Sequence, residues 1–131
     1  MKHQIQHKED IKLLVDSFYE KVLKDDVIGF IFTEVVPISW DEHMPLMYSF
    51  WESMLLDEMS YRGNMMVTHL ALHKKVRLEE RHFDRWKQLF FETLDAHFEG
   101  EKVAEAKKRV ENMAALMLYK IGQSEQPGFI Q

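Results

Sequence analysis

Apolar side chains recur every three or four residues along most of this chain, a spacing that places them on one face of an α-helix. The first such stripe consists of Ile11, Leu14, Val15, Phe18 and Val22. Proline and glycine, which interrupt helices, are scarce in the middle of the chain. An apolar helix face needs another element to cover it, so the sequence predicts an all-α fold.

The breaks between the stripes predict where the helices begin and end. We expect helices over residues 9–24, 40–56, 65–72, 79–98 and 101–121. Ser39 and Glu42 have the spacing of a capping box at the start of the second helix. Gly100 separates the last two helices, and Gly122 is placed to end the last one.

The segments between these helices are expected to be irregular: short turns over 27–36, a loop over 57–64 and a basic connection over 73–77. A chain of 131 residues is enough for one domain. We therefore expect an N-terminal arm over 1–8, a domain over 9–121 and a flexible C-terminal tail over 122–131.

Composition excludes several classes of protein. There is no cysteine, so neither a disulfide nor a thiolate metal site is expected. The formal net charge of -5 argues against nucleic acid or an anionic membrane as the main partner, because both need a basic footprint. No apolar run approaches the ~20 residues that cross a bilayer. The first residues also lack the apolar core of a signal peptide, so we expect a cytoplasmic protein.

His69 is the most informative of the seven histidines, because apolar residues surround it in the sequence. These neighbours are Met65, Met66, Leu70 and Leu72. An imidazole directed into an apolar space is a candidate metal ligand, although an ordinary core histidine has the same pattern. His69 and His73 also have a spacing that binds zinc, but no glutamate follows His69 as in the His-Glu-x-x-His signature.

Two hydrogen-bond donors are directed inward from two different helices. Tyr19 lies on the inward side of the first helix, and Trp86 lies in the stripe between Phe83 and Phe90. A buried indole N–H needs an acceptor, and a bound ligand would supply one. His43 lies one turn before Met47 on the helix that would cover such a ligand, although by itself it is equally consistent with a surface histidine.

The order of short motifs along the chain is more specific than any one of them. They are Phe18-Tyr19, Gly29-x-Ile31-Phe32, Trp40-x-x-His43, Phe50-Trp51, Tyr61-x-Gly63-Asn64, His69-Leu70-x-Leu72 and His82-Phe83-Asp84-x-Trp86. Over residues 9–121 this ordered set resembles the group III truncated haemoglobins. The resemblance implies a truncated globin-like fold, a two-on-two helical sandwich around a haem.

The resemblance also implies roles for individual residues. His69 matches the proximal iron ligand, and Phe32 matches the ring that packs against the porphyrin face. Tyr19 and Trp86 match the distal hydrogen-bond donors, and His43 the histidine of the distal helix. The remaining expected haem contacts are Met47, Phe50, Leu72, His73 and Arg77. The candidate partners of the haem propionates are the basic residues His73, Lys74, Lys75 and Arg77, although a solvated loop has the same composition. Met65 stands where the family often has proline, which puts the order of the short proximal helix in doubt.

A haem held by one histidine leaves an iron position open for O2, NO, CO or peroxide. The haem would be of type b, since no cysteine is present to attach it. Two polar donors favour slow ligand release, and so favour NO dioxygenation or peroxide reduction, with an electron-donating reductase as a partner, over transport. Three alternatives stay open: a haem-based oxygen or NO sensor, a haem-free helical interaction domain, and a zinc or di-iron helical enzyme. The last lacks the Glu-x-x-His pairs of di-iron bundles.

Overall fold

The computed structural model describes residues 2–35, 39–56, 69, 71–73 and 77–124. Its elements are helix α1 (Lys8–Lys24), the π-helical turn η1 (Ile31–Val35), and helices α2 (Trp40–Leu55), α4 (Glu80–His97) and α5 (Glu101–Ser124). Residues 69 and 71–73 are also helical. Extended pairing within the described residues is limited to a single bridge between His3 and Phe98. The all-α prediction is confirmed.

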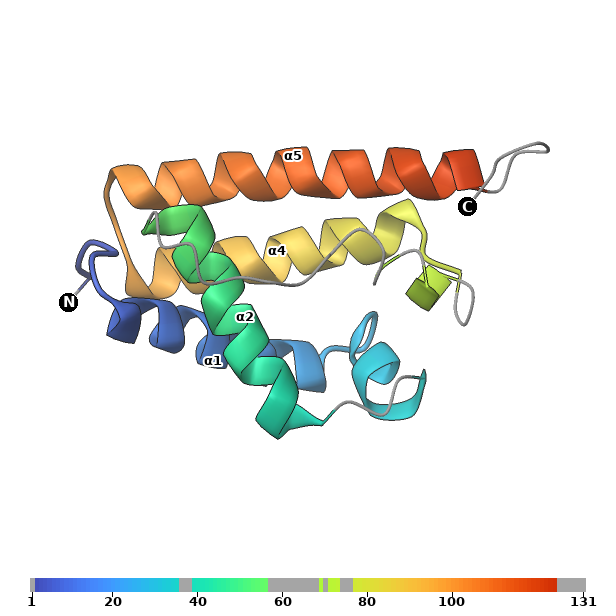
Figure 1. Ribbon diagram of the computed structural model, residues 1–131, viewed down its shortest axis with the longest axis horizontal. Coiled ribbons are helices and arrows are strands. Elements are labelled where there is room, and N and C mark those ends of the chain that lie inside the picture. Colours follow the sequence, from blue (N-terminus) through green and yellow to red (C-terminus); the bar gives the residue numbers. More distant parts are fainter. Residues whose placement is uncertain (1, 36–38, 57–68, 70, 74–76, 125–131) are drawn as a thin grey trace.

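The four long helices form two pairs that pack on each other. Helix α1 packs against α2 and α4, and α5 packs against α4 and α2. Figure 1 shows α4 and α5 running antiparallel, while α2 crosses the other helices steeply. This arrangement is the predicted two-on-two helical sandwich. None of the helices in the described part of the chain is both long and apolar enough to span a membrane.

Phe90 lies at the centre of the core. Its ring centroid is 5.1 Å from that of Phe18 on α1, 4.6 Å from that of Trp51 on α2 and 5.7 Å from that of Trp86 on α4. Burying a Phe side chain contributes roughly 1.5–3 kcal/mol. One fully buried ring therefore ties three helices together, and the predicted stripe of α1 is buried against it.

The segment that follows α1 is held by a buried carboxylate. Asp25 caps the end of α1, and its Oδ2 accepts hydrogen bonds from the backbone N–H groups of Val27 and Ile28 at 3.0 and 3.1 Å. Gly29 then passes so close to α1 that a Cβ there would lie 2.9 Å from the carbonyl oxygen of Val22. Over the described residues 27–35, the expected turns are thus a turn followed by a helical segment, and this segment carries Phe32.

The chain before α1 packs on the domain. Ile5 is buried, and the carbonyl of His3 accepts the N–H of Glu99 at 3.0 Å. The corner that receives it contains Gly100, whose φ of 104° is in the region that favours glycine. Gly100 therefore separates α4 from α5 as predicted.

Two expected helix ends differ from the structure. Ser39 is the N-cap of α2 as expected, but its side chain makes no capping hydrogen bond with the described residues. The backbone carbonyl of Ser39 accepts the N–H of His43 at 2.8 Å instead. Gly122 does not end α5, which continues to Ser124. A glycine ends a helix when it adopts a positive φ, and Gly122 does not, while Gln123 bonds the Tyr119 hydroxyl in the last turn.

Several expected elements lie partly or wholly outside the described residues. These are the loop over 57–64, the helix over 65–72 apart from residues 69, 71 and 72, the connection over 74–76 and the tail beyond residue 124.

Candidate functional site

Tyr19 and His43 form a hydrogen-bonded pair between crossing helices. Tyr19 is buried on α1, His43 is half-buried in the first turns of α2, and the Tyr19 hydroxyl lies 3.1 Å from His43 Nε2. The sequence stripe that directs Tyr19 inward and the backbone cap that starts α2 at Trp40 together produce this contact. Two predicted distal residues are thus brought together.

Aromatic rings surround this pair. The Tyr19 ring meets Phe32 of η1 and Trp40 of α2 edge to face, at centroid distances of 5.8 and 5.6 Å. Trp40 also contacts the His43 ring at 5.5 Å and the Phe32 ring at 6.4 Å. Three elements therefore build one aromatic enclosure around two polar groups. Trp40 appears in a motif of the sequence without an assigned role, and its spacing to His43 was the signal for one.

The enclosure keeps both polar groups uncharged near pH 7. Burial raises the pKa of the Tyr19 hydroxyl well above its ordinary value. Burial also lowers the pKa of His43 below its ordinary value of 6.5. The pair is therefore a neutral hydrogen-bonding group in an apolar setting, where each hydrogen bond is stronger than in water.

Trp86 lies next to this cluster on α4. Its ring stacks on Phe90 at an interplanar angle of 11° and meets Phe18 edge to face at 5.8 Å. Phe18 in turn meets Tyr19 at 5.2 Å. Phe18 therefore connects the two predicted donors, one on α1 and one on α4.

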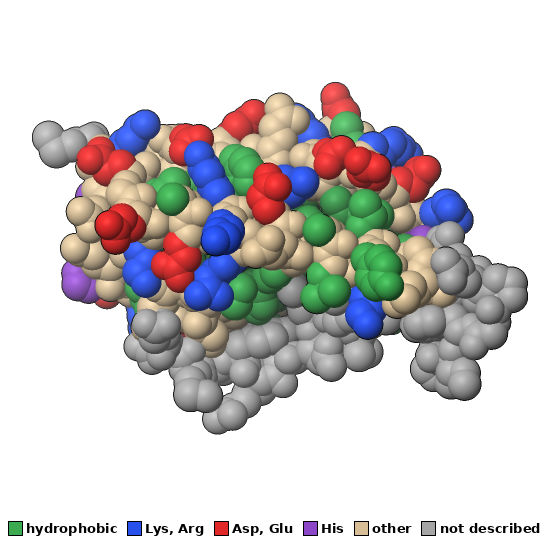
Figure 2. Space-filling model, turned by 90° about the horizontal axis from the view of Figure 1, so that it is seen from above, with side chains coloured by type: hydrophobic (Ala, Val, Ile, Leu, Met, Phe, Trp, Pro, Cys, Tyr) green, Lys and Arg blue, Asp and Glu red, His purple; other side chains and the backbone are tan. Residues whose placement is uncertain are grey.

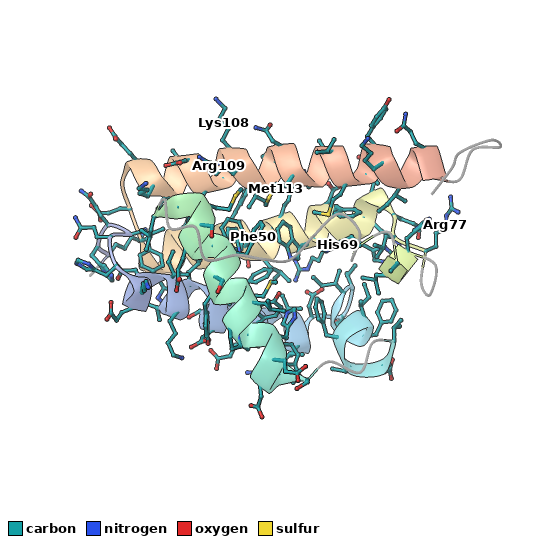
Figure 3. The ribbon with its side chains drawn as sticks, in the orientation of Figure 1. Phe50, His69, Arg77, Lys108, Arg109 and Met113 are labelled. Atoms are coloured by element: carbon teal, nitrogen blue, oxygen red, sulfur yellow. The ribbon has the colours of Figure 1, made fainter. Side chains whose placement is uncertain are left out.

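Met47 and Phe50 follow His43 along the same side of α2, as their spacing predicts. Met47 is half-buried against the core, while Phe50 is buried with its ring edge-on to Trp51 at 5.2 Å. Figure 3 shows Phe50 where α2 crosses α4. These side chains give α2 an apolar inner face beyond the polar pair.

The predicted proximal residues lie in the described fragments before α4. His69, Leu72 and His73 are half-buried, and Arg77 is exposed. In the view of Figure 3, His69 lies between the crossing of α2 and the end of the molecule from which Arg77 extends. The Nδ1 atom of His73 accepts the N–H of Leu78 at 2.9 Å. His73 is therefore bound to the connection that leads into α4.

His82 is a buried residue to which the sequence gave no role. It lies in the first turn of α4, and its Nδ1 accepts the N–H of Glu79 at 2.9 Å. Its Nε2 is buried and, within the described part of the chain, has no hydrogen-bond partner. Two signals for it were present: no Ser, Thr or Asp precedes Glu79 to cap the helix, and His82 is one turn before Trp86.

A metal site built from several protein ligands is not formed by the described residues. No three His, Asp or Glu side chains among them are gathered closely enough to hold an ion. A hollow of about 910 Å³ lies at another place, between the N-terminal arm, the end of α2 and the start of α5, and none of the predicted site residues lines it.

Known proteins settle the family. No protein-family model matches the chain. A group 3 truncated haemoglobin of Campylobacter jejuni is 34% identical over 128 residues, which make up 93% of this chain and 98% of that protein. The chain belongs to the group III truncated haemoglobins. The crystal structure of a group III truncated haemoglobin from Campylobacter jejuni matches the fold with a TM-score of 0.81 at 31% identity, covering 92% of this chain and 95% of that one.

Membership in the group III truncated haemoglobins confirms the resemblance and the fold, and makes haem the cofactor and diatomic gases such as O2 the ligands. The chain's own residues fit that cofactor. The aromatic ring of Phe32 suits a flat apolar macrocycle, and the neutral Tyr19–His43 pair suits a small polar ligand. The Nε2 atom of His82 is buried, and no group in the described part of the chain forms a hydrogen bond with it.

Proposed function

We propose that this protein binds a b-type haem through His69 and holds diatomic ligands against Tyr19, His43 and Trp86 for chemistry rather than for transport. The reaction class is NO dioxygenation or peroxide reduction. The observation that carries the proposal is the part-buried hydrogen bond between the Tyr19 hydroxyl and His43 Nε2, beside the rings of Phe32 and Trp40.

The proximal side of the proposal rests on His69 and its neighbours. A neutral imidazole is a common haem ligand, and with no cysteine in the chain the haem is bound without a covalent link. Phe32, Met47, Phe50 and Leu72 would supply apolar contacts to the macrocycle. Arg77 lies at the end of the molecule where α4 begins, and His73 is bonded to the neighbouring Leu78, so both would face the haem carboxylates.

The distal side of the proposal rests on donors without net charge. When bound, ferrous haem supplies an open coordination position and the single electron with which NO and O2 combine to nitrate. The Tyr19 hydroxyl and the Trp86 indole N–H donate hydrogen bonds to the polar end of the ligand. His43 orients the Tyr19 hydroxyl, because the two already share a hydrogen bond. The surrounding rings exclude water, which strengthens each of these bonds.

Strong retention of ligand favours reaction over transport. Each hydrogen bond contributes about 0.5–1.5 kcal/mol net. Two such bonds slow release by about 10–100-fold, since each 1.4 kcal/mol is tenfold. An oxygen carrier has to release its ligand as fast as the ligand is consumed. A haem enzyme instead keeps its ligand until a second reactant arrives, and is then reduced again by one electron. An electron-donating reductase is the protein partner that this cycle requires.

Haem binding through His69 is tested by reconstitution with haemin. The wild-type protein is expected to give a strong Soret band, and His69→Ala to lose haemin to excess apomyoglobin far faster. His97→Ala, at the far end of α4, removes another half-buried imidazole and serves as the control. Equal haemin retention by His69→Ala and the wild-type protein would overturn the proximal assignment.

A further inference from the structure

The first turn of α4 carries a buried hydrogen-bond donor whose direction is determined by the backbone. His82 is 4% exposed, and its Nδ1 accepts the N–H of Glu79, the residue that precedes the helix. A neutral imidazole has one proton, so Nδ1 as acceptor places the proton on Nε2. Burial, together with the nearby Arg81 guanidinium, lowers the pKa of His82 and keeps the ring neutral.

The N–H at Nε2 has no acceptor among the residues that the structure describes. Within the described residues it makes no hydrogen bond, although it is buried. A buried donor without a partner destabilises a protein by about 1–3 kcal/mol, so such atoms are rare in native structures. The capping bond to Glu79 alone would not require an imidazole. At the same position of α1, Asp10 caps the N–H of His7 at 2.9 Å with a shorter side chain.

The surroundings of His82 indicate what the donor meets. His82 lies one turn before Trp86 on the same face of α4, and its ring lies 6.4 Å from that of Phe30, two residues before Phe32. The connection over 77–79 also contacts His82. The Nδ1 atom of His82 accepts the N–H of Glu79, and the Nδ1 atom of His73 accepts the adjacent N–H of Leu78. The His82 ring thus contacts Phe30, near Phe32 in the chain, and is bonded to the connection that also holds His73.

We propose that His82 donates its Nε2–H to a carboxylate of the bound haem, and so fixes the rotation of the macrocycle in its site. A carboxylate accepts strongly from a neutral N–H, and the start of a long helix adds a favourable potential for an anion. The inference rests on the proposed function, since it needs a haem in this enclosure. It adds a role for His82, which positions the cofactor without contacting its iron.

Two variants separate the two nitrogen atoms of the ring. In His82→Asn the amide oxygen replaces Nδ1 as acceptor for Glu79, as the Asp10 carboxylate does in α1, but no donor reaches the Nε2 position. In His82→Gln the longer amide carries a donor to the Nε2 position and loses the cap. Haemin loss from the ferric protein to excess apomyoglobin, without added gas, is then measured for each.

We expect His82→Asn to lose haemin about tenfold faster than the wild-type protein, the equivalent of about 1.4 kcal/mol. We expect His82→Gln to retain haemin like the wild-type protein while unfolding at a lower urea concentration. With haemin dimethyl ester, whose carboxylates are blocked, the difference between His82→Asn and the wild-type protein is expected to fall below threefold.

Each other outcome overturns the inference in a different way. If His82→Asn and His82→Gln lose haemin equally fast, a donor at the Nε2 position does not restore retention, and the donor has no role. If only His82→Gln loses haemin faster than the wild-type protein, the cap explains the effect. If His82→Asn behaves like the wild-type protein, the haem brings no acceptor to Nε2. If the tenfold difference persists with the diester, the acceptor is another oxygen atom. Wild-type protein that retains no haemin at all would overturn the proposed function as well, which separates the two failures.

Discussion

The Tyr19 hydroxyl and His43 Nε2 lie 3.1 Å apart, so two polar side chains from crossing helices already hold each other inside an aromatic enclosure. The pair has two consequences. It satisfies the buried Tyr19 hydroxyl and the half-buried His43 imidazole, which would otherwise destabilise the contact between α1 and α2. It also directs the Tyr19 hydroxyl, because one hydrogen bond limits the positions from which that group can make another.

The first prediction concerns Tyr19→Phe, which removes the hydroxyl and changes little else. We expect O2 to dissociate about 3–10-fold faster from the haem-loaded variant, because one hydrogen bond of ~1 kcal/mol is lost. CO is less polar when bound and should respond less. Stopped-flow replacement of each gas measures both rates.

Tyr48→Phe is the matched control for this prediction. Tyr48 also joins α2 to α1, but its hydroxyl donates to Asp16 at the surface, next to Lys12. Its loss is expected to alter the unfolding midpoint slightly and to leave O2 dissociation unchanged. An equal increase for O2 and CO in Tyr19→Phe would mean that the hydroxyl controls access rather than polarity.

The second prediction concerns the loss of stability in mild acid. The pKa of His43 is lowered on folding, so the unfolded chain binds its proton first as pH falls from the ordinary value of 6.5. The stability that the neutral ring contributes is complete above that value and is lost below it. We therefore expect the urea concentration at the midpoint of unfolding to be lower at about pH 5 than at about pH 7. This decrease should be smaller in His43→Gln.

The lowered pKa values of Asp10 and Asp25 act in a different window. The folded protein keeps these carboxyls ionised below their ordinary value of 3.8, so their contribution is lost only in stronger acid. A change between pH 7 and pH 5 thus reports the histidines. An equal pH dependence in His43→Gln and the wild-type protein would contradict the assignment to His43.

The third prediction concerns the ion pair between Arg85 and Asp25, which fixes the segment leading to Phe32. The Asp25 side chain is 4% exposed, and its Oδ1 accepts from Arg85 at 2.6 Å. Removing the guanidinium leaves a buried carboxylate with backbone partners only, so Arg85→Gln should lower the free energy of unfolding by about 2–3 kcal/mol. Lys107→Gln, which breaks the exposed pair with Asp95, should lower it by less than about 1 kcal/mol. Equal losses in the urea titrations would contradict this.

Helix positions followed from the sequence because local spacing determines which face is buried. The stripe of α1 is buried as expected, and α4 begins and ends within one residue of its predicted bounds. The predicted end of α5 was wrong because a glycine ends a helix in this way only when its backbone adopts a positive φ, and Gly122 does not adopt one.

The chemistry of the site followed from the sequence only in part. Periodicity directed Tyr19 inward, but its bond to His43 depends on the angle at which α2 crosses α1, which no local pattern contains. The sequence could not predict that His82 Nε2 lacks a partner among the described residues. That result depends on which ring nitrogen accepts the N–H of Glu79, which only the folded geometry determines. The face seen in Figure 2 interleaves acidic and basic side chains with apolar ones. Leu116 and Tyr119 of α5 are exposed.

The last prediction concerns the reaction with nitric oxide. A pocket with donors on two helices, Tyr19 on α1 and Trp86 on α4, should release O2 slowly and leave time for a second reactant. Nitric oxide is small and apolar enough to pass the inner face of α2 at Met47 and Phe50. Mixing the O2-loaded protein with NO in a stopped-flow instrument should therefore give ferric haem and one nitrate per haem much faster than O2 leaves spontaneously. Tyr19→Phe should reduce the difference between the rate of reaction with NO and the rate of O2 dissociation, because it speeds O2 dissociation and does not speed the reaction with NO. Fast O2 release in the wild-type protein, combined with slow reaction toward both NO and peroxide, would favour a carrier or a sensor instead.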